Sequence, residues 1–259
     1  MELGLQGRRA LVFGGSKGLG LACGRRLAEA GVEVWLAART DSTLQAAANA
    51  LRVQTAGKVH AVVADIRLET GRAAALAACP APDILVTNAD GASPGDFREW
   101  DRQDWLNALD AMMLGPIELI RQCLDPMAAR GFGRIINIVS RSVKAPQAEL
   151  GLSNGARAGL VGFVAGLSRQ AIRHNITINN ILPGMFATDA QRRHVQALAE
   201  REGLDAPALW AQRAAEVPAG RFGDPDEVGA LCAFLASLQA SYLTGQSILM
   251  DGGAYPGTY

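Results

Sequence analysis

The strongest constraint on the fold is the regular alternation of short apolar runs with longer segments of helical period. The runs of strand length span residues 9–13, 32–37, 59–63, 84–87, 134–139, 176–181 and 247–250. The first helical segment ends near residue 30, and the others span residues 42–51, 68–78, 101–130, 150–174 and 224–238. Nearly all of the runs are apolar on both faces, as in a parallel sheet that helices cover on both sides. The sequence therefore predicts an α/β protein with a doubly wound parallel sheet of about seven strands.

No internal repeat, low-complexity segment or linker divides the chain, so we expect residues 1–259 to form a single domain. Residues 188–220 interrupt the alternation with a polar, helix-prone insertion. Ligands of doubly wound sheets bind beyond the carboxyl ends of the strands, where such an insertion can act as a lid. We therefore expect a substrate lid at about residues 188–220.

The composition excludes several classes of protein. The chain has 25 basic and 25 acidic residues, so it offers no positive surface for nucleic acid or anionic lipid. Its apolar stretches are shorter than the roughly 20 residues of a membrane helix, and the first residues do not resemble a secretory signal. The four cysteines lie far apart and indicate buried thiols, neither a disulfide framework nor a metal site. We expect a cytoplasmic protein that acts on a small molecule, with no nucleic-acid, membrane or metal partner.

A glycine-rich turn joins the first strand to the first helix. Its candidate cofactor-binding residues are Gly14, Ser16, Lys17, Gly18, Leu19 and Gly20. Glycine allows a tight turn and lets a pyrophosphate approach the backbone, and the amino end of the following helix attracts the anion. The turn therefore indicates a dinucleotide site, and a purely structural turn is the alternative.

The end of the second strand indicates which dinucleotide binds. An acidic residue there selects NAD through the ribose hydroxyls, whereas an arginine favours the 2′-phosphate of NADP. Arg39 stands at this place and no carboxylate does, while Lys17 adds a second positive charge from the glycine-rich turn. The sequence thus favours NADP(H) over NAD(H), the alternative being that Arg39 is a solvated surface residue.

Taken in order, these and later motifs resemble the short-chain dehydrogenases/reductases over about residues 5–254. The motifs are the glycine-rich turn, residues 64–66, 87–91, 135–140 and 179–184, Thr188, and residues 221–225, 242–245 and 251–253. The resemblance implies a Rossmann-like fold and further cofactor contacts from Asp65, Ile66, Asn88, Ala89, Pro183, Gly184 and Thr188. Asp90 stands where this family prefers glycine, which places a carboxylate near the cofactor.

The catalytic positions that the resemblance implies depart from the family pattern. The family uses an asparagine, a serine, and a tyrosine followed four residues later by a lysine. Ser140 matches the serine, whereas Ser153 and Arg157 occupy the tyrosine and lysine places and Met112 the asparagine place. An aliphatic hydroxyl is a far weaker acid than a phenol, and arginine stays charged at neutral pH. The usual proton donor is therefore missing.

Two groups are candidates to replace that donor. Lys144 lies four residues after Ser140, in the loop that borders the substrate in this family, and a desolvated lysine can titrate near neutrality. The alternative for Lys144 is a solvated loop residue. Tyr255 and Tyr259 are the second possibility, because the tails of related tetramers reach a neighbouring site.

These observations predict an NADP(H)-dependent oxidoreductase, similar to ketoacyl reductases, that transfers hydride between the nicotinamide and a carbonyl/alcohol pair. Ser140 would polarise the carbonyl, Lys144 would supply the proton, and Ser153 with Arg157 would orient ribose or substrate. One alternative is a catalytically impaired dinucleotide-binding protein that serves as a sensor or inactive partner. A second is a lyase or isomerase on the same frame. The resemblance also implies a homotetramer or a dimer.

Overall fold

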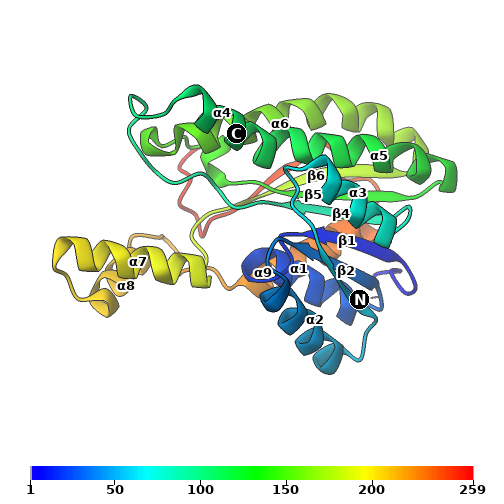
Figure 1. Ribbon diagram of the computed structural model, residues 1–259, viewed down its shortest axis with the longest axis horizontal. Helices are drawn as coiled ribbons and strands as arrows, with labels where there is room; N and C mark the ends of the chain where they lie inside the picture. Colours follow the sequence, from blue (N-terminus) through cyan, green and yellow to red (C-terminus); the bar gives the residue numbers. More distant parts are fainter. Residues whose placement is uncertain (1, 259) are drawn as a thin grey trace.

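The computed structural model describes residues 2–258, and within them seven strands form one parallel sheet (Figure 1). The strands are β1 (Arg9–Phe13), β2 (Glu33–Ala38), β3 (Val59–Val63), β4 (Ile84–Asn88), β5 (Gly133–Ile138), β6 (Ile176–Pro183) and β7 (Ser247–Met250). Their order in the sheet is β3-β2-β1-β4-β5-β6-β7, and all neighbours are parallel. The predicted doubly wound sheet is thereby confirmed.

Helices cover the two faces of the sheet (Figure 1). One face carries α1 (Gly18–Glu29), α2 (Asp41–Thr55) and α9 (Pro225–Ala236), and the other carries α3 (Glu69–Ala78), α5 (Gly115–Arg130) and α6 (Gly151–Ala171). Successive strand residues point to opposite faces. Val12 of β1 accordingly joins the apolar cluster under α1, while its neighbour Leu11 joins the cluster under α5 and α6. The core thus consists of two apolar layers that hold the sheet rigid.

The helical stretch expected at residues 101–130 is present, and it contains a π-helical turn that the sequence did not predict. α4 (Arg102–Leu109) passes into a π-helical turn (Asp110–Leu114) before α5 begins. A side chain at Gly115 would collide with the backbone oxygen of Ile66, so the chain approaches the segment after β3 closely here. Pro116 follows directly, and because the helical backbone continues from the π-helical turn, its missing N–H cannot donate a hydrogen bond to that turn. π-Helical turns of this kind occur frequently at functional sites.

The insertion at residues 188–220 folds as two helices, α7 (Asp189–Glu202) and α8 (Ala206–Ala215), which lie side by side away from the body of the protein (Figure 1). Thr188 begins α7, and its hydroxyl oxygen accepts a hydrogen bond from the backbone N–H of Gln191. The helices share a small apolar cluster of Val195, Ala199 and Leu209. The insertion therefore has a core of its own.

Between residues 2 and 258, no helix combines the length and apolarity needed to cross a membrane. The four cysteines are buried and unpaired. The same residues contain no group of three or more histidine, cysteine or acidic side chains arranged to hold a metal ion.

Candidate active site

A cavity of about 910 Å³ opens at the carboxyl ends of the central strands. Phe13 of β1, Asn88 of β4, Ile138 of β5 and Pro183 of β6 each contribute to its wall. β1 lies between β2 and β4, so the chain order reverses beside it. Ligands of open α/β sheets bind at such a switch point, beyond the carboxyl ends of the strands. The position of the cavity is therefore that of a nucleotide site.

The glycine-rich turn forms an anion cradle at one side of this cavity. Gly14 and Gly18 have φ values of +64° and +57°, a conformation that favours glycine. Side chains at Gly14 and Gly20 would collide with Asn88 and with the Gly14 backbone oxygen, respectively. Lys17 precedes α1 without capping it through its side chain, and the first turn of α1 contains no acidic residue. Backbone N–H groups at this helix end thus suit a pyrophosphate.

The structure brings together nearly all of the residues that the sequence singled out. Among the predicted cofactor residues, those that line the cavity are Gly14, Ser16, Lys17, Gly18, Leu19, Arg39, Asp65, Ile66, Asn88, Ala89, Pro183, Gly184 and Thr188. Gly20 is buried behind the turn, where only glycine fits. Ser140, Ser153 and Arg157 line the same cavity, and Lys144 does not.

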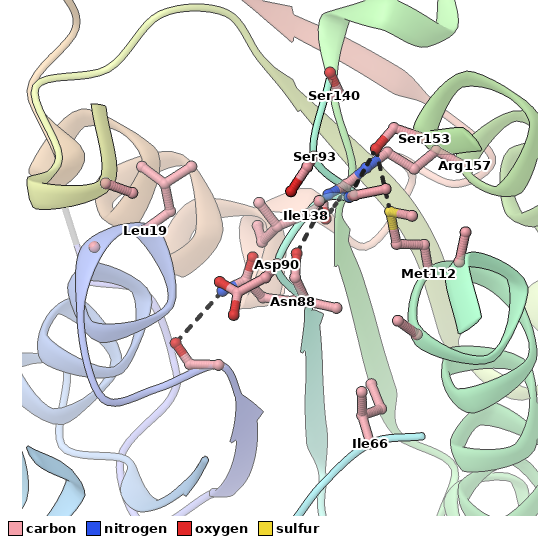
Figure 2. A pocket seen from close by; sticks show the side chains of 18 of the residues that line it. Leu19, Ile66, Asn88, Asp90, Ser93, Met112, Ile138, Ser140, Ser153 and Arg157 are labelled. Carbon is pink, nitrogen blue, oxygen red and sulfur yellow. Dashed lines mark hydrogen bonds between the residues drawn. The ribbon is translucent and has the colours of Figure 1, made fainter. Parts of the chain in front are cut away.

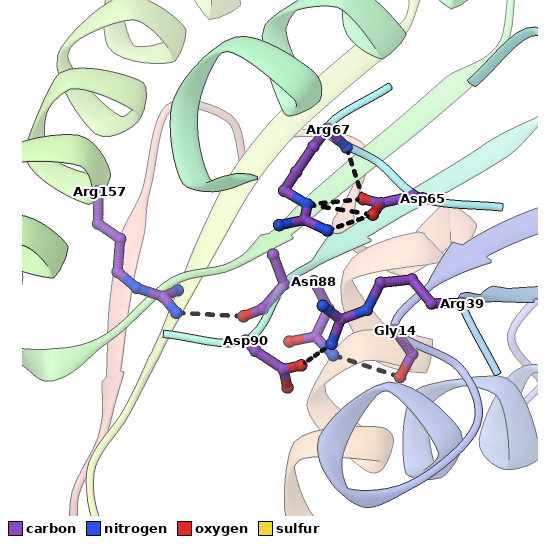
Figure 3. A network of polar contacts seen from close by, with 8 residues as sticks. Gly14, Arg39, Asp65, Arg67, Asn88, Asp90 and Arg157 are labelled. Atoms are coloured by element: carbon purple, nitrogen blue, oxygen red, sulfur yellow. Dashed lines mark hydrogen bonds and ion pairs between the residues drawn. The ribbon is translucent and has the colours of Figure 1, made fainter. Parts of the chain in front are cut away.

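Two ion pairs mark the end of the cavity that adjoins β2 and β3 (Figure 3). Arg39 donates to the Asp90 carboxylate at 2.5 Å, and Arg67 donates to the Asp65 carboxylate at 2.6 Å. The hydrogen bond from Arg67 lowers the pKa of Asp65 below its usual value. Arg67 was not predicted as a site residue from the sequence, although its position two residues after Asp65 could have indicated the ion pair. With Lys17, this end of the cavity holds three cations and two carboxylates.

Ser140, Ser153 and Arg157 mark the opposite end of the cavity (Figure 2). The Ser153 hydroxyl accepts a hydrogen bond from the Ala92 N–H at 3.3 Å and donates to the sulfur of Met112 at 3.5 Å. The Ser140 hydroxyl oxygen accepts from the Ser142 N–H at 3.1 Å, which fixes its place after β5. Met112 comes from the π-helical turn, so this turn helps to set the position of Ser153.

Arg157 binds backbone rather than another side chain. Its guanidinium donates to the carbonyl oxygens of Val139 at 2.7 Å and of Ile138 and Ala89 at 3.2 Å each. Burial lowers the pKa of Arg157 to about 10, and the negative charge of Asp90 opposes that shift. Arg157 therefore stays charged at neutral pH and ties the segments after β4 and β5 together.

Lys144 points toward the carboxy-terminal tail. Its ammonium lies 6.0 Å from the ring centre of Tyr255, and a short turn over Arg141–Val143 separates it from Ser140. The backbone N–H of Tyr255 donates to the Asp251 carboxylate at 2.8 Å, which holds the tail beside this loop. Tyr259 lies outside the described residues. The structure thus places Lys144 in the loop of Ser140 but not in the cavity wall.

Two residues of α4 that line the cavity, Asp104 and Asn107, were not predicted from the sequence. Trp100, in the segment before α4, lines the cavity beside them. The side chain of Asp101 accepts from the Asp104 N–H, and the Asp104 carboxylate accepts from the Asp101 N–H in return. This capping box was the available signal that a helix begins there. Polar and aromatic groups therefore border the end of the cavity near Ser153.

Comparison with known proteins agrees with this geometry over nearly the whole chain. The family described as enoyl-(acyl carrier protein) reductase matches residues 14–255. NADPH-dependent reductase BacG of Bacillus subtilis is 31% identical over 252 residues, which cover 95% of this chain and 97% of BacG.

Two solved structures extend the comparison. L-Sorbose reductase from Gluconobacter frateurii, in complex with NADPH and L-sorbose, is 29% identical and superimposes with a TM-score of 0.95, covering 99% of this chain and 100% of that one. An NADPH-bound short-chain oxidoreductase from Pseudomonas aeruginosa, described as containing an atypical catalytic center, is 29% identical with a TM-score of 0.86, covering 97% and 98%. On the family match and these full-length similarities, the chain belongs to the short-chain dehydrogenase/reductase family.

Proposed function

We propose that this protein is an NADP(H)-dependent oxidoreductase that interconverts a small or medium carbonyl compound and its alcohol. The observation that carries the proposal is a single cavity with an anion cradle near Gly14 and serine hydroxyls at its other end. Such a cavity suits a dinucleotide laid from the cradle toward Ser140 and Ser153. The similarity to NADPH-dependent reductases supports the same assignment.

The residues at the cofactor end fit NADPH. The amino end of α1 and the open turn at Gly14 would hold the pyrophosphate, and Arg39 and Lys17 would face the 2′-phosphate. When bound, this cofactor supplies or accepts a hydride. Asp65 and Ile66 would border the adenine, and Asn88, Ala89, Pro183, Gly184 and Thr188 the ribose and nicotinamide parts.

The chain's own groups would orient and polarise the substrate. The Ser140 hydroxyl would donate a hydrogen bond to the substrate oxygen, and Ser153 would help to orient the same group. The Arg157 guanidinium adds positive charge behind the segments after β4 and β5, where negative charge develops on that oxygen. Lys144 remains our proposed source of the proton, and because it lies outside the cavity wall its proton must pass through a bridging water.

A second candidate function is dinucleotide binding without turnover, as in a sensor or an inactive partner. Among the described residues that line the cavity there is no tyrosine, and Lys17 is their one lysine. A cavity without a titrating phenol or a substrate-side ammonium lacks the usual means of proton donation. Loss of general acid catalysis typically lowers the rate by about 10²–10⁴.

Turnover of NADPH with ketones, keto esters, ketoses and ketoacyl thioesters tests the proposal. We expect oxidation of NADPH with at least one class, and a kcat about 10²-fold lower for Ser140→Ala. Lys144→Ala should lower kcat most at high pH, where a proton from water is scarcest. Tight NADPH binding without turnover on any compound would instead favour the second candidate. Product formation at constant NADPH absorbance would identify a lyase or an isomerase.

We also propose that the chain assembles as a homotetramer or a dimer through α6. Side chains at Gly162 and Gly166 would meet no atom within 4 Å, and Phe163 between them is 41% exposed. Such a surface of small residues beside an exposed ring permits close approach of a second helix. Light scattering measures the mass, and a monomer would contradict this expectation.

A further inference from the structure

We propose that Asp90 weakens the preference of this protein for NADPH over NADH, because it neutralises Arg39 and faces the 2′-phosphate. The proposal rests on the proposed NADP(H) function and names a residue that tunes it. Asp90 stands where the family resemblance leads one to expect glycine.

The location of the ion pair is the first argument. Arg39 follows β2 and Asp90 follows β4, and these strands flank β1 on its two sides. The pair therefore crosses the mouth of the crevice beside the glycine-rich turn, directly over the place where the dinucleotide would lie (Figure 3). Both residues line the same cavity. A cofactor that enters this crevice must meet both side chains.

The chemistry of Arg39 is the second argument. A guanidinium matches carboxylate and phosphate oxygens with the same planar set of donors, so the two anions compete for it. Of the other cations at this end, Arg67 is engaged by Asp65 through several hydrogen bonds. Lys17 is exposed in the turn. With Arg67 engaged, Arg39 and Lys17 remain as partners for a 2′-phosphate, and Asp90 already pairs with Arg39.

The charge of Asp90 is the third argument. The side chains of Arg39 and Asp90 are 54% and 70% exposed, so their ion pair is weak and a phosphate can displace it. The displaced carboxylate then remains beside a group that carries nearly two negative charges, which repels it. NADH brings no such phosphate, and its ribose hydroxyl can donate a hydrogen bond to the carboxylate. Asp90 therefore disfavours NADPH without disfavouring NADH.

Replacement of Asp90 by asparagine tests this role through binding alone. Calorimetric titration of the full chain with adenosine 2′,5′-bisphosphate and with AMP compares adenosine ligands that differ in the 2′-phosphate. We expect Asp90→Asn to bind the bisphosphate more tightly by up to about fivefold, the upper limit for an exposed ion pair, and AMP no more tightly than before. The gain should shrink as the salt concentration rises.

Asp96→Asn is the matched control. Asp96 pairs with Arg98 in the same segment after β4, and neither residue lines the cavity. This control removes the same charge near the site, so it should leave both affinities unchanged. An equal gain in affinity for both ligands in Asp90→Asn, or no gain in affinity for the bisphosphate, would overturn the role of Asp90.

The same titration separates this proposal from the proposed reaction. If the unsubstituted chain binds neither ligand, the cofactor assignment fails and the role of Asp90 fails with it. If the chain binds both ligands and Asp90→Asn shows the selective gain, the role stands even where no substrate is turned over. An absence of turnover together with this selective gain would count only against the oxidoreductase assignment.

Discussion

Replacement of Arg157 by methionine tests whether a buried cation organises the cavity. Methionine keeps much of the side-chain volume but removes three hydrogen bonds to the backbone oxygens of Val139, Ile138 and Ala89. Hydrogen bonds from a charged group contribute about 1.5–3 kcal/mol each, so together they stabilise the fold by about 6 kcal/mol. Burial disfavours the charged guanidinium and lowers the pKa of Arg157 to about 10, which offsets part of this stabilisation. We therefore expect the free energy of unfolding to fall by about 3 kcal/mol.

The change should also weaken cofactor binding, since Ala89 and Val139 line the cavity. Loss of their common anchor lets the segments after β4 and β5 move apart. We expect NADPH affinity, measured by fluorescence titration under conditions where the variant is folded, to fall at least about tenfold, or about 1.4 kcal/mol. Denaturant unfolding of the same samples gives the stability.

Arg134 offers a matched control at the far end of the sheet. It lies at the start of β5, whereas the Ile138 and Val139 oxygens that Arg157 binds lie at the other end of this strand. The Arg134 guanidinium donates to the backbone oxygens of Gly133, Asn175 and Ser237. Burial lowers the pKa of Arg134 to about 10 as well. Arg134→Met should therefore lose similar stability but keep its NADPH affinity within about twofold. Equal losses of affinity in both variants, or an unchanged stability in Arg157→Met, would refute the reasoning.

Two further predictions follow from the core and the glycine-rich turn. Gly20→Ala places a methyl group against the Gly14 backbone oxygen, so the turn must shift. Titration should show an NADPH affinity at least about tenfold lower, while circular dichroism shows an unchanged helix content. Burial raises the pKa of Cys79 and of Cys123 from 9.0 to about 12, so a disulfide reagent at neutral pH should label neither thiol before unfolding. Above pH 9 the unfolded chain loses these protons first, so denaturant unfolding should show stability falling as the pH rises toward 12, and a rise would contradict the assignment.

The strands could be predicted from sequence because burial on both faces leaves a direct trace in the residues. The expected range 9–13 coincides with β1 and the range 84–87 lies within β4, and both strands are almost wholly buried. The π-helical turn left no such trace, because it depends on the contact between Gly115 and the backbone of Ile66, a residue distant in the chain. Local pattern therefore predicted the layers of the fold but not the irregular turn that supplies Met112.

The residues of the candidate site likewise differ in whether they could be predicted from sequence. The glycine-rich turn is one continuous segment, so its residues could be recognised together. The partners of Arg157 come from two strands, and only the folded chain brings Ala89 and Val139 to one guanidinium. Lys144 is near Ser140 in sequence, but the intervening short helical turn directs it toward Tyr255. Proximity along the chain was therefore a poor guide to the cavity wall.

The separate core of α7 and α8 has a consequence for how this protein can diversify. Val195, Ala199 and Leu209 pack with one another, outside the two apolar layers that hold the sheet. Substitutions or length changes within this hairpin therefore leave the sheet packing intact. Its residues Asp189, Ala190 and Gln191 border the cavity, so such changes reach the bound molecule directly. We therefore expect changes in this hairpin to alter which substrate binds while the nucleotide-binding frame stays constant.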